Sequence, residues 1–225
     1  MRVLAIDTAL ANCAAAVLDN SSDMPCYVET SEEVGRGHAE KLMAMIGEVM
    51  AESSTAFTDL DRVVVTTGPG SFTGLRVGLS VAKGFGLVLE KPVVGITTLA
   101  AIARAMAARG LDGPVLVALT GKADEVYCQL FDDAGEPLED AAVRKLGTLS
   151  GHIPAGTCLA GSAASKVAEA LEGRTAEVLC EAGFPAIADV AHLGLTADPK
   201  SAIAAPLYLR PPDATPQKKG RIERK

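Results

Sequence analysis

At 225 residues and with a formal net charge of −7, the chain can form one large domain or two small ones, and its acidity argues against an independent nucleic-acid-binding protein. It has no tryptophan and only 4% aromatic residues, so a base-stacking platform is not expected. The N-terminus leads directly into a strand, and glycines and charges interrupt each later apolar run. We therefore expect a cytoplasmic protein without a signal peptide or a membrane span.

The first half of the sequence predicts strands that alternate with helices. Asp7 and Thr8 end the first strand, and a polar turn joins it to the second as a hairpin. Strands are expected at 3–8, 13–18, 26–30, 62–67 and 93–96, and helices at 38–52, 72–89 and 98–109.

The stretch from 68 to 94 organises this half. Gly68-Pro69-Gly70 ends a buried strand in a tight turn, and Ser71 or Thr73 can cap the helix that follows. That helix carries four glycines, each of which costs about 0.5–1 kcal/mol relative to alanine. We therefore expect a buried central helix against which another backbone packs closely.

The opening pattern recurs after Pro114, with a strand, a polar turn and a second strand. Aligned without gaps, Ala5 falls on Ala118 and Asp19 on Asp132, 113 residues later. The apolar classes agree along both strands although few residues are identical, so we predict an internal duplication.

The remaining segments complete a second lobe. Strands are expected at 157–160 and 178–179, helices at 162–171 and 185–195, and an extended segment at 206–210. We predict an α/β fold with an N-terminal lobe at 1–110, a C-terminal lobe at 111–210 and a disordered basic tail at 211–225. The cations of the tail could attract nucleic-acid phosphates or remain solvated, and they are Lys218, Lys219, Arg221, Arg224 and Lys225.

The five cysteines show no paired spacing and lie among apolar residues. We expect them to be reduced thiols in the core rather than a metal or redox site, at Cys13, Cys26, Cys128, Cys158 and Cys180.

Short motifs along the chain fit one family pattern. They are Leu4-Ala5-Ile6-Asp7-Thr8, His38 at the start of the first helix, Gly68-Pro69-Gly70-Ser71-Phe72-Thr73-Gly74-Leu75-Arg76, Gly95-Ile96-Thr97-Thr98-Leu99, Glu125-Val126-Tyr127 and Pro206-Leu207-Tyr208-Leu209-Arg210. The glycine-rich run is the most specific of them. In this order they resemble the TsaB (YeaZ) family over nearly the whole fold.

The resemblance implies an actin/Hsp70/sugar-kinase-like (ASKHA) fold of two related lobes, in agreement with the repeat. It also implies a non-catalytic subunit that binds and activates TsaD and works with TsaE to form threonylcarbamoyladenosine at position 37 of tRNAs that read ANN codons. The family implies no cofactor of its own, although ATP or ADP could lie at the interface of the complex. A homodimer could form in isolation.

One departure from the family concerns the end of the strand that opens the second half. Many members have Asp-Ala-Arg there, whereas this chain has Thr120-Gly121-Lys122. An acidic residue would be the second-lobe counterpart of Asp7, so its replacement weakens the case for independent nucleotide chemistry.

Two groups of residues are candidate phosphate contacts. The loop residues Gly70, Ser71, Thr73 and Gly74 lie at a positive helix end, although no lysine follows at P-loop spacing and the loop could simply be a tight connection. The second group, Asp7 and Thr8, could position a metal-bound phosphate or could bond its own turn.

Partner contacts are expected from two helices. The helix at 38–52 has an apolar stripe rich in methionine, which suits an adaptable surface, although such a stripe can also be core. In the family this helix and the glycine-bearing one meet TsaD or a second copy. The predicted interface comprises His38, Leu42, Met43, Met45, Ile46, Val49, Met50 and Arg76.

The alternative function is an enzyme of the same fold, either an ATP-dependent phosphotransferase or a metallopeptidase. The phosphotransferase would need an acidic residue at Thr120. The metallopeptidase would need a metal site, and His38, His152 and His192 have no ligand spacing. We therefore favour the non-catalytic partner and expect no catalytic or metal-binding residues.

Overall fold

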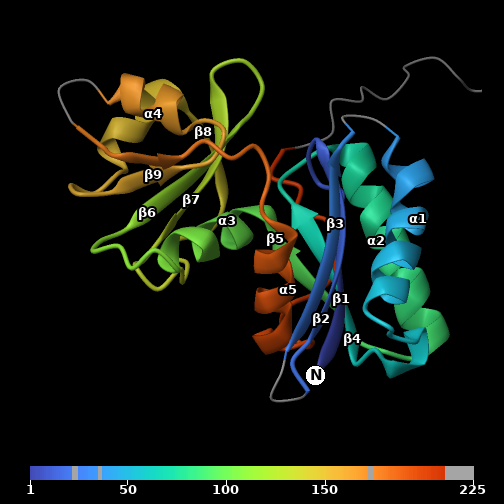
Figure 1. The fold of residues 1–225 in the computed structure, drawn as a ribbon. Coiled ribbons are helices and arrows are strands. Elements are labelled where there is room, and N and C mark those ends of the chain that lie inside the picture. Colours follow the sequence, from blue (N-terminus) through green and yellow to red (C-terminus); the bar gives the residue numbers. More distant parts are fainter. Residues whose placement is uncertain (22–24, 35–36, 172–174, 211–225) are drawn as a thin grey trace, which may run out of the picture.

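The structure, a computed structural model, describes residues 1–21, 25–34, 37–171 and 175–210. These residues form two lobes side by side, each built on a mixed five-stranded sheet (Figure 1). The predicted basic tail at 211–225 lies outside the described residues.

The chain forms two runs of three successive strands, and helices and further strands follow each run. They are β1 (Arg2–Asp7), β2 (Asn12–Asp19), β3 (Cys26–Glu33), α1 (His38–Glu52), β4 (Arg62–Gly68), α2 (Phe72–Leu89), β5 (Val93–Thr97), α3 (Thr98–Ala107), β6 (Val115–Thr120), β7 (Glu125–Phe131), β8 (Ala142–Lys145), β9 (Cys158–Ala160), α4 (Ala164–Ala170), β10 (Val178–Cys180) and α5 (Ile187–Thr196). Short 3-10 helices lie at Phe57–Asp59 and Leu146–Gly151. The sequence did not predict β8.

The two sheets have the same topology, which confirms the predicted duplication. The first has the order β3-β2-β1-β4-β5, and the second, taken from its opposite edge, has the order β8-β7-β6-β9-β10. In both, the first three strands in the chain are antiparallel neighbours and the last two join in parallel. Strand β6 begins and ends 113 residues after β1, so Thr120 occupies the position of Asp7.

The first sheet is covered on both faces. Side chains alternate along a strand, so Leu4 and Ile6 of β1 face α1 and α2, whereas Val3 and Ala5 face α5. Helix α5 lies within the segment assigned from sequence to the second lobe, yet it packs on β1 and β2. The apolar face of the first sheet accounts for this placement, because α5 covers the side that α1 and α2 leave open.

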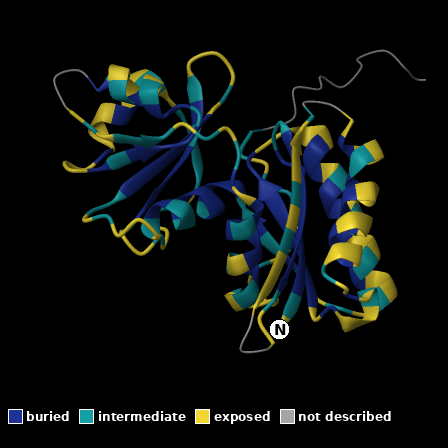
Figure 2. Cartoon of the chain, in the orientation of Figure 1, coloured by how far each residue is buried: buried dark blue, intermediate teal, exposed yellow. Residues whose placement is uncertain are grey.

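Helix α2 is not the buried central helix expected from sequence. It lies at the surface beside α1, with its inner side on β4 and an exposed outer side (Figure 2). Among the described residues it is the one helix long and apolar enough to cross a membrane. Its inner side packs on β4.

The cysteines are less uniformly buried than predicted. Cys13 and Cys128 are buried, and burial raises the pKa of both thiols to about 11. Cys158 and Cys180 are half-buried. Cys26 is exposed on the edge strand β3, so its prediction as a core residue is wrong.

Candidate functional site

The glycine-rich loop between β4 and α2 is pressed against the β1–β2 turn. The Ser71 amide donates to the Ala9 carbonyl at 2.6 Å, and a Cβ atom on Gly70 would lie 2.2 Å from the same oxygen. The Ser71 hydroxyl caps α2 by accepting from the Gly74 amide at 3.3 Å. The loop therefore forms a tight connection between β4 and α2, which was one of the two alternatives that the sequence left open.

The side chains of Asp7 and Thr8 form hydrogen bonds that brace this connection. Oδ1 of the fully buried Asp7 accepts from the Ala9 amide at 2.9 Å and the Thr66 hydroxyl at 2.5 Å. Its Oδ2 has no hydrogen-bond partner within the described part of the chain, and burial raises the pKa of the carboxyl. The Thr8 hydroxyl donates to the Gly74 carbonyl at 2.7 Å. Both side chains therefore hold the end of β1 in place.

His38 begins α1 as a buried side chain. Its Nε2 lies 2.9 Å from the Leu10 carbonyl oxygen, which joins α1 to the β1–β2 turn. In the described ranges, no three His, Cys, Asp or Glu side chains are grouped to hold a metal ion.

The N-terminal ends of α1 and α2 converge on an open cleft of about 470 Å³. The structure brings four of the predicted site residues to its walls, namely His38, Ser71, Thr73 and Gly74. The positive ends of both helix dipoles point to this region, and the acidic side chain of Glu40, in the first turn of α1, already lines the cleft there.

A second cleft, of about 350 Å³, lies between the lobes, and we call it the interlobe cleft. Gly70 and Ser71 line it from the first lobe, and Thr120, Lys122 and Tyr127 from the second. The Thr120 hydroxyl donates to the Ser162 carbonyl at 3.2 Å, and its amide donates to the Ser162 hydroxyl at 3.0 Å.

Most of the predicted interface stripe on α1 belongs to the core. These side chains pack on the first sheet, and this part of the interface prediction is wrong for Leu42, Met45, Ile46, Val49 and Met50. An amphipathic helix beside a sheet buries its apolar stripe there, so the stripe is not available to a partner. Met43, in contrast, is 53% exposed.

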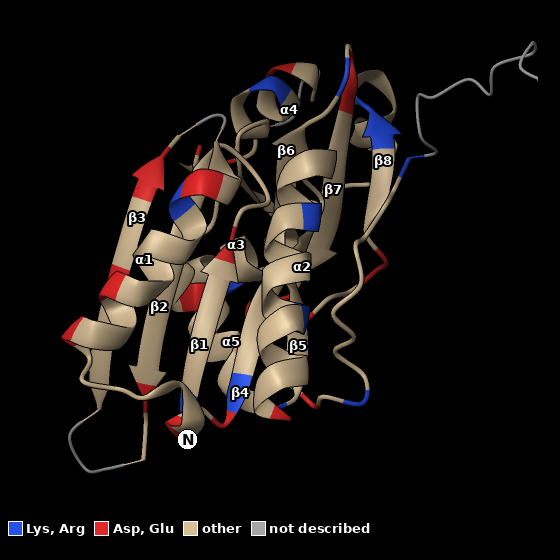
Figure 3. Cartoon of the chain, turned by 90° about the vertical axis from the view of Figure 1, so that its right-hand side faces the viewer, with Lys and Arg blue, Asp and Glu red and all other residues tan. Residues whose placement is uncertain are grey.

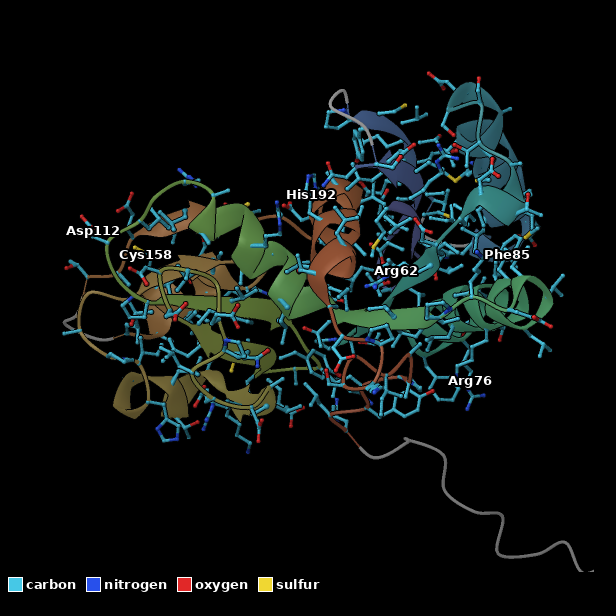
Figure 4. The ribbon with its side chains drawn as sticks, turned by 90° about the horizontal axis from the view of Figure 1, so that it is seen from below. Arg62, Arg76, Phe85, Asp112, Cys158 and His192 are labelled. Atoms are coloured by element: carbon cyan, nitrogen blue, oxygen red, sulfur yellow. The ribbon has the colours of Figure 1, made fainter. Side chains whose placement is uncertain are left out.

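Arg76 is exposed but held by aromatic neighbours. Its guanidinium carbon lies 3.8 Å from the centre of the Phe72 ring, and its Nε donates to the Tyr208 hydroxyl at 3.4 Å. The Phe72 and Tyr208 rings stack with centroids 5.5 Å apart. Figure 4 shows Arg76 at the periphery of the first lobe.

On the outward sides of the two helices, the sequence prediction included Met43 and Arg76 but not the exposed residues near the C-terminal end of α2. In Figure 3 these sides face the viewer, and α2 carries few charges. Leu87 and Val88 are 82% and 79% exposed, and a Cβ atom on Gly47 or Gly84 would meet no atom within 4 Å. We define the outer helix face as Met43, Ala44, Gly47, Gly84, Leu87 and Val88. In the sequence, the i, i+4 spacing of these small and apolar residues could have indicated that they share one face of each helix.

Comparisons of sequence identify relatives. Residues 30–203 match the family described as "TsaD: tRNA N6-adenosine threonylcarbamoyltransferase". The tRNA threonylcarbamoyladenosine biosynthesis protein TsaB of Escherichia coli (strain K12) is 35% identical over 127 residues, which cover 56% of this chain and 53% of the relative. The chain thus spans about half the length of this relative. An uncharacterized protein of Mycobacterium tuberculosis, Rv3421c, is 33% identical over 95% of this chain and 94% of its own.

A comparison of structures supports the fold. YeaZ from Pseudomonas aeruginosa has a TM-score of 0.76 and 24% identity, and the match covers 92% of this chain and 99% of that one. A second Pseudomonas aeruginosa protein, described as similar to the peptidase YEAZ, has a TM-score of 0.79 and 24% identity over 93% of this chain and 99% of its own. Both share the overall fold of this chain, which supports the predicted fold.

Proposed function

We propose that this chain, which belongs to the TsaB (YeaZ) family, takes part in forming threonylcarbamoyladenosine on tRNA as a non-catalytic partner of TsaD. The names of its relatives and the description of the matching family support this class of function. In the proposed complex TsaE is a further member, tRNA is the substrate, and the compartment is the cytoplasm.

The outer helix face is the observation that carries the proposal. Leu87 and Val88 expose most of their surface although both are large and apolar. Burial of apolar area against a partner contributes about 25 cal/mol per Å², so these side chains favour association. Gly47 and Gly84 are open to solvent, and residues without a Cβ let a partner helix approach closely. In the isolated chain the same face would support a homodimer.

The polar groups near the helix ends support a non-catalytic role. The carboxyl of Asp7 and the hydroxyl of Thr8 are engaged in the fold. The second lobe has Thr120 where a phosphotransferase of this fold would need a carboxylate. Catalysis in the proposed complex therefore belongs to TsaD.

A nucleotide in the complex fits the cleft between the ends of α1 and α2. Ser71 and Thr73 line this cleft, at the N-terminal end of α2. We propose that ATP or ADP lies there between this chain and TsaD, with the helix dipoles facing its phosphates.

The test is co-purification with TsaD from the same source, using a matched pair of variants. Leu87→Glu with Val88→Glu places two charges on the outer helix face and should abolish association and the stimulation of tRNA modification. Leu138→Glu changes a residue of the second lobe that is 56% exposed, and it should leave both unchanged. Undiminished association of the double variant would refute the proposed surface.

A second assay tests the absence of catalysis. The purified chain alone should show no tRNA modification and at most trace ATP turnover. Sustained ATP turnover that Asp7→Ala abolishes would show that this chain is itself an enzyme.

A further inference from the structure

The two edges of the first sheet differ in how the described part of the chain covers them. On β5, the segment that follows α5 adds its own backbone, and the Gly95 amide donates to the Ala202 carbonyl at 2.9 Å. Next to this contact, Val94 and Ile203 form an isolated antiparallel bridge. On β3, at the opposite edge, no described strand pairs with the outer side (Figure 3). An open edge presents unpaired N–H and C=O groups that another chain can bind.

Strand β3 is long and regular for an edge strand. It has eight residues, contains no proline and pairs with β2 along its whole length without a register shift. Its counterpart in the second sheet, β8, has four residues. Proteins commonly shorten an edge strand, or place a bulge or a proline in it, to prevent further pairing. Strand β3 has none of these features, so its backbone is suited to receive another strand.

The backbone groups that point outward from β3 follow from its pairing with β2. The Val34 amide donates to the Ala11 carbonyl at 3.0 Å, and these two residues continue the register of the two strands. In an antiparallel pair every second residue is hydrogen-bonded to the partner strand, so counting back from Val34 identifies the residues bonded to β2. The intervening residues direct their N–H and C=O groups to the open side. We call their N–H groups the outward amides, and they belong to Tyr27, Glu29, Ser31 and Glu33.

The side chains of β3 give its two faces different chemistry. Leu18, which pairs with Tyr27, lies in the apolar cluster beneath α5, so alternate side chains from Tyr27 onward share that face. Two of them are the exposed carboxylates of Glu29 and Glu33, and the Tyr27 hydroxyl donates to the first. On the other face, the half-buried Val28 packs against the core beneath α1. An added strand would therefore meet carboxylates on one face and an apolar border on the other.

We propose that the open edge of β3 binds an extended segment of a partner protein in which lysine or arginine alternates with apolar residues. The segment pairs with the outward backbone groups as an added strand. Its cations lie opposite Glu29 and Glu33, and its apolar side chains extend the cluster that includes Val28. This edge is a different surface from the outer helix face, so the proposal does not rest on binding to TsaD.

Charge disfavours a second copy of this chain as the occupant. In an antiparallel pair of β3 strands centred on Ser31, Glu29 of one copy would lie opposite Glu33 of the other. Like charges directly opposite each other destabilise a strand pair. A register shifted by two residues still leaves carboxylates as diagonal neighbours, within reach of one another. A basic segment replaces this repulsion with attraction.

The probe is a synthetic peptide in which lysine alternates with valine, with the same length as β3. Hydrogen exchange of the full chain, followed by NMR with and without the peptide, locates the binding. The outward amides should gain at least about tenfold protection, whereas the amides of Val28 and Thr30 already donate to β2 and should change little. A second peptide of the same composition, with its lysines in one block and its valines in another, should not protect the outward amides.

Two variants of β3 and a matched control complete the test. Glu29→Gln with Glu33→Gln should weaken peptide binding by about threefold to tenfold, because two cross-strand charge pairs are lost. Ser31→Pro removes one outward N–H, which an edge strand tolerates, and should abolish binding. Glu169→Gln with Glu181→Gln removes the same charge from exposed positions of the second lobe and should bind as the unmodified chain does. Circular dichroism checks that each variant is folded.

The proposal is overturned if the alternating peptide does not protect the outward amides, or if the block peptide protects them equally, because charge alone would then explain binding. Equal loss of affinity in the control and in the Glu29→Gln, Glu33→Gln variant also overturns it. Protection of the outward amides without peptide would reveal another occupant, a second copy if it rises with chain concentration and a segment of the same chain if it does not. Either result contradicts the proposal. If Ser31→Pro does not fold, the charge variants and the exchange pattern decide.

Discussion

The Thr8 hydroxyl donates a 2.7 Å hydrogen bond to the carbonyl oxygen of Gly74, joining the end of β1 to the first turn of α2. The backbones approach so closely that a Cβ atom on Gly74 would lie 2.1 Å from the Thr8 carbonyl oxygen. Gly84 occupies the same helix but faces open space. Gly74 therefore allows β1 to approach α2 closely, whereas Gly84 lies on a side of α2 that meets no neighbour.

Alanine at these two positions should have opposite effects on stability. Gly74→Ala should lower the free energy of unfolding by about 1–3 kcal/mol, because the new methyl group overlaps backbone atoms. Gly84→Ala should raise it by about 0.5–1 kcal/mol, because alanine is the better helix former and meets no neighbour. Denaturant titration of both variants measures the difference, and equal destabilisation would contradict the packing described here.

Sequence reasoning identified the glycine-bearing helix but not the side on which it packs. Four glycines indicated a close neighbour, and Gly74, Gly78 and Gly86 do lie against Thr8 or Val93. Helical periodicity shows which residues share a face, but the sheet that covers that face comes from distant parts of the chain. The outward position of Gly84 could therefore be recognised only from the structure.

Asp7 should make stability depend on pH. Burial raises the pKa of its carboxyl above that of the unfolded chain, which is about 4. The contribution of Asp7 to the free energy of unfolding is fully present below the pKa of its carboxyl in the unfolded chain. It is lost as the pH rises through the pKa of the same carboxyl in the folded chain. Asp7→Asn should remove this part of the pH dependence, so that the variant gains stability relative to the unmodified chain as pH rises.

Guanidinium unfolding at a series of pH values measures this difference. Asp133→Asn is the control, because it makes the same substitution at an exposed position. A parallel pH dependence in the Asp7→Asn variant and the unmodified chain would show that Asp7 is not the group responsible.

On α1, Ile46 lies in the core and Met43 lies at the surface. Ile46 is fully buried, so Ile46→Ala should cost about 2–5 kcal/mol of stability. Met43→Ala should change stability by less than about 0.5 kcal/mol and weaken association with TsaD. Thermal unfolding and co-purification of both variants test this assignment, which fails if Met43→Ala is the more destabilising change.

The apolar stripe on α1 also shows what limits the prediction of a partner site. Its spacing was recognised correctly, but spacing alone does not tell whether a stripe meets its own sheet or another chain. The first sheet presents Leu4 and Ile6 on this side, and α1 covers them. The outward side of α1 near Gly47 remains for the proposed partner contact, and its small residues carry little hydrophobic signal.

Arg62 should fix α5 to the first lobe. From the start of β4 it donates to the carbonyl oxygens of Gly194 and Ala197, at 2.7 and 2.8 Å, and so satisfies the C-terminal end of α5 (Figure 4). The position of α5 had no local signal in the sequence, because its cover of the first sheet depends on residues more than a hundred positions apart.

Arg62→Met should lower the free energy of unfolding by about 2–4 kcal/mol, because one buried and one part-buried carbonyl group lose a charged donor. Arg62→Lys keeps one donor and should recover part of the loss, whereas Lys166→Met on the exposed side of α4 should have little effect. Hydrogen exchange locates the change, with the amides of α5 losing protection before those of α2. Equal loss of protection in both helices would show that Arg62 stabilises the first lobe as a whole and does not act through α5.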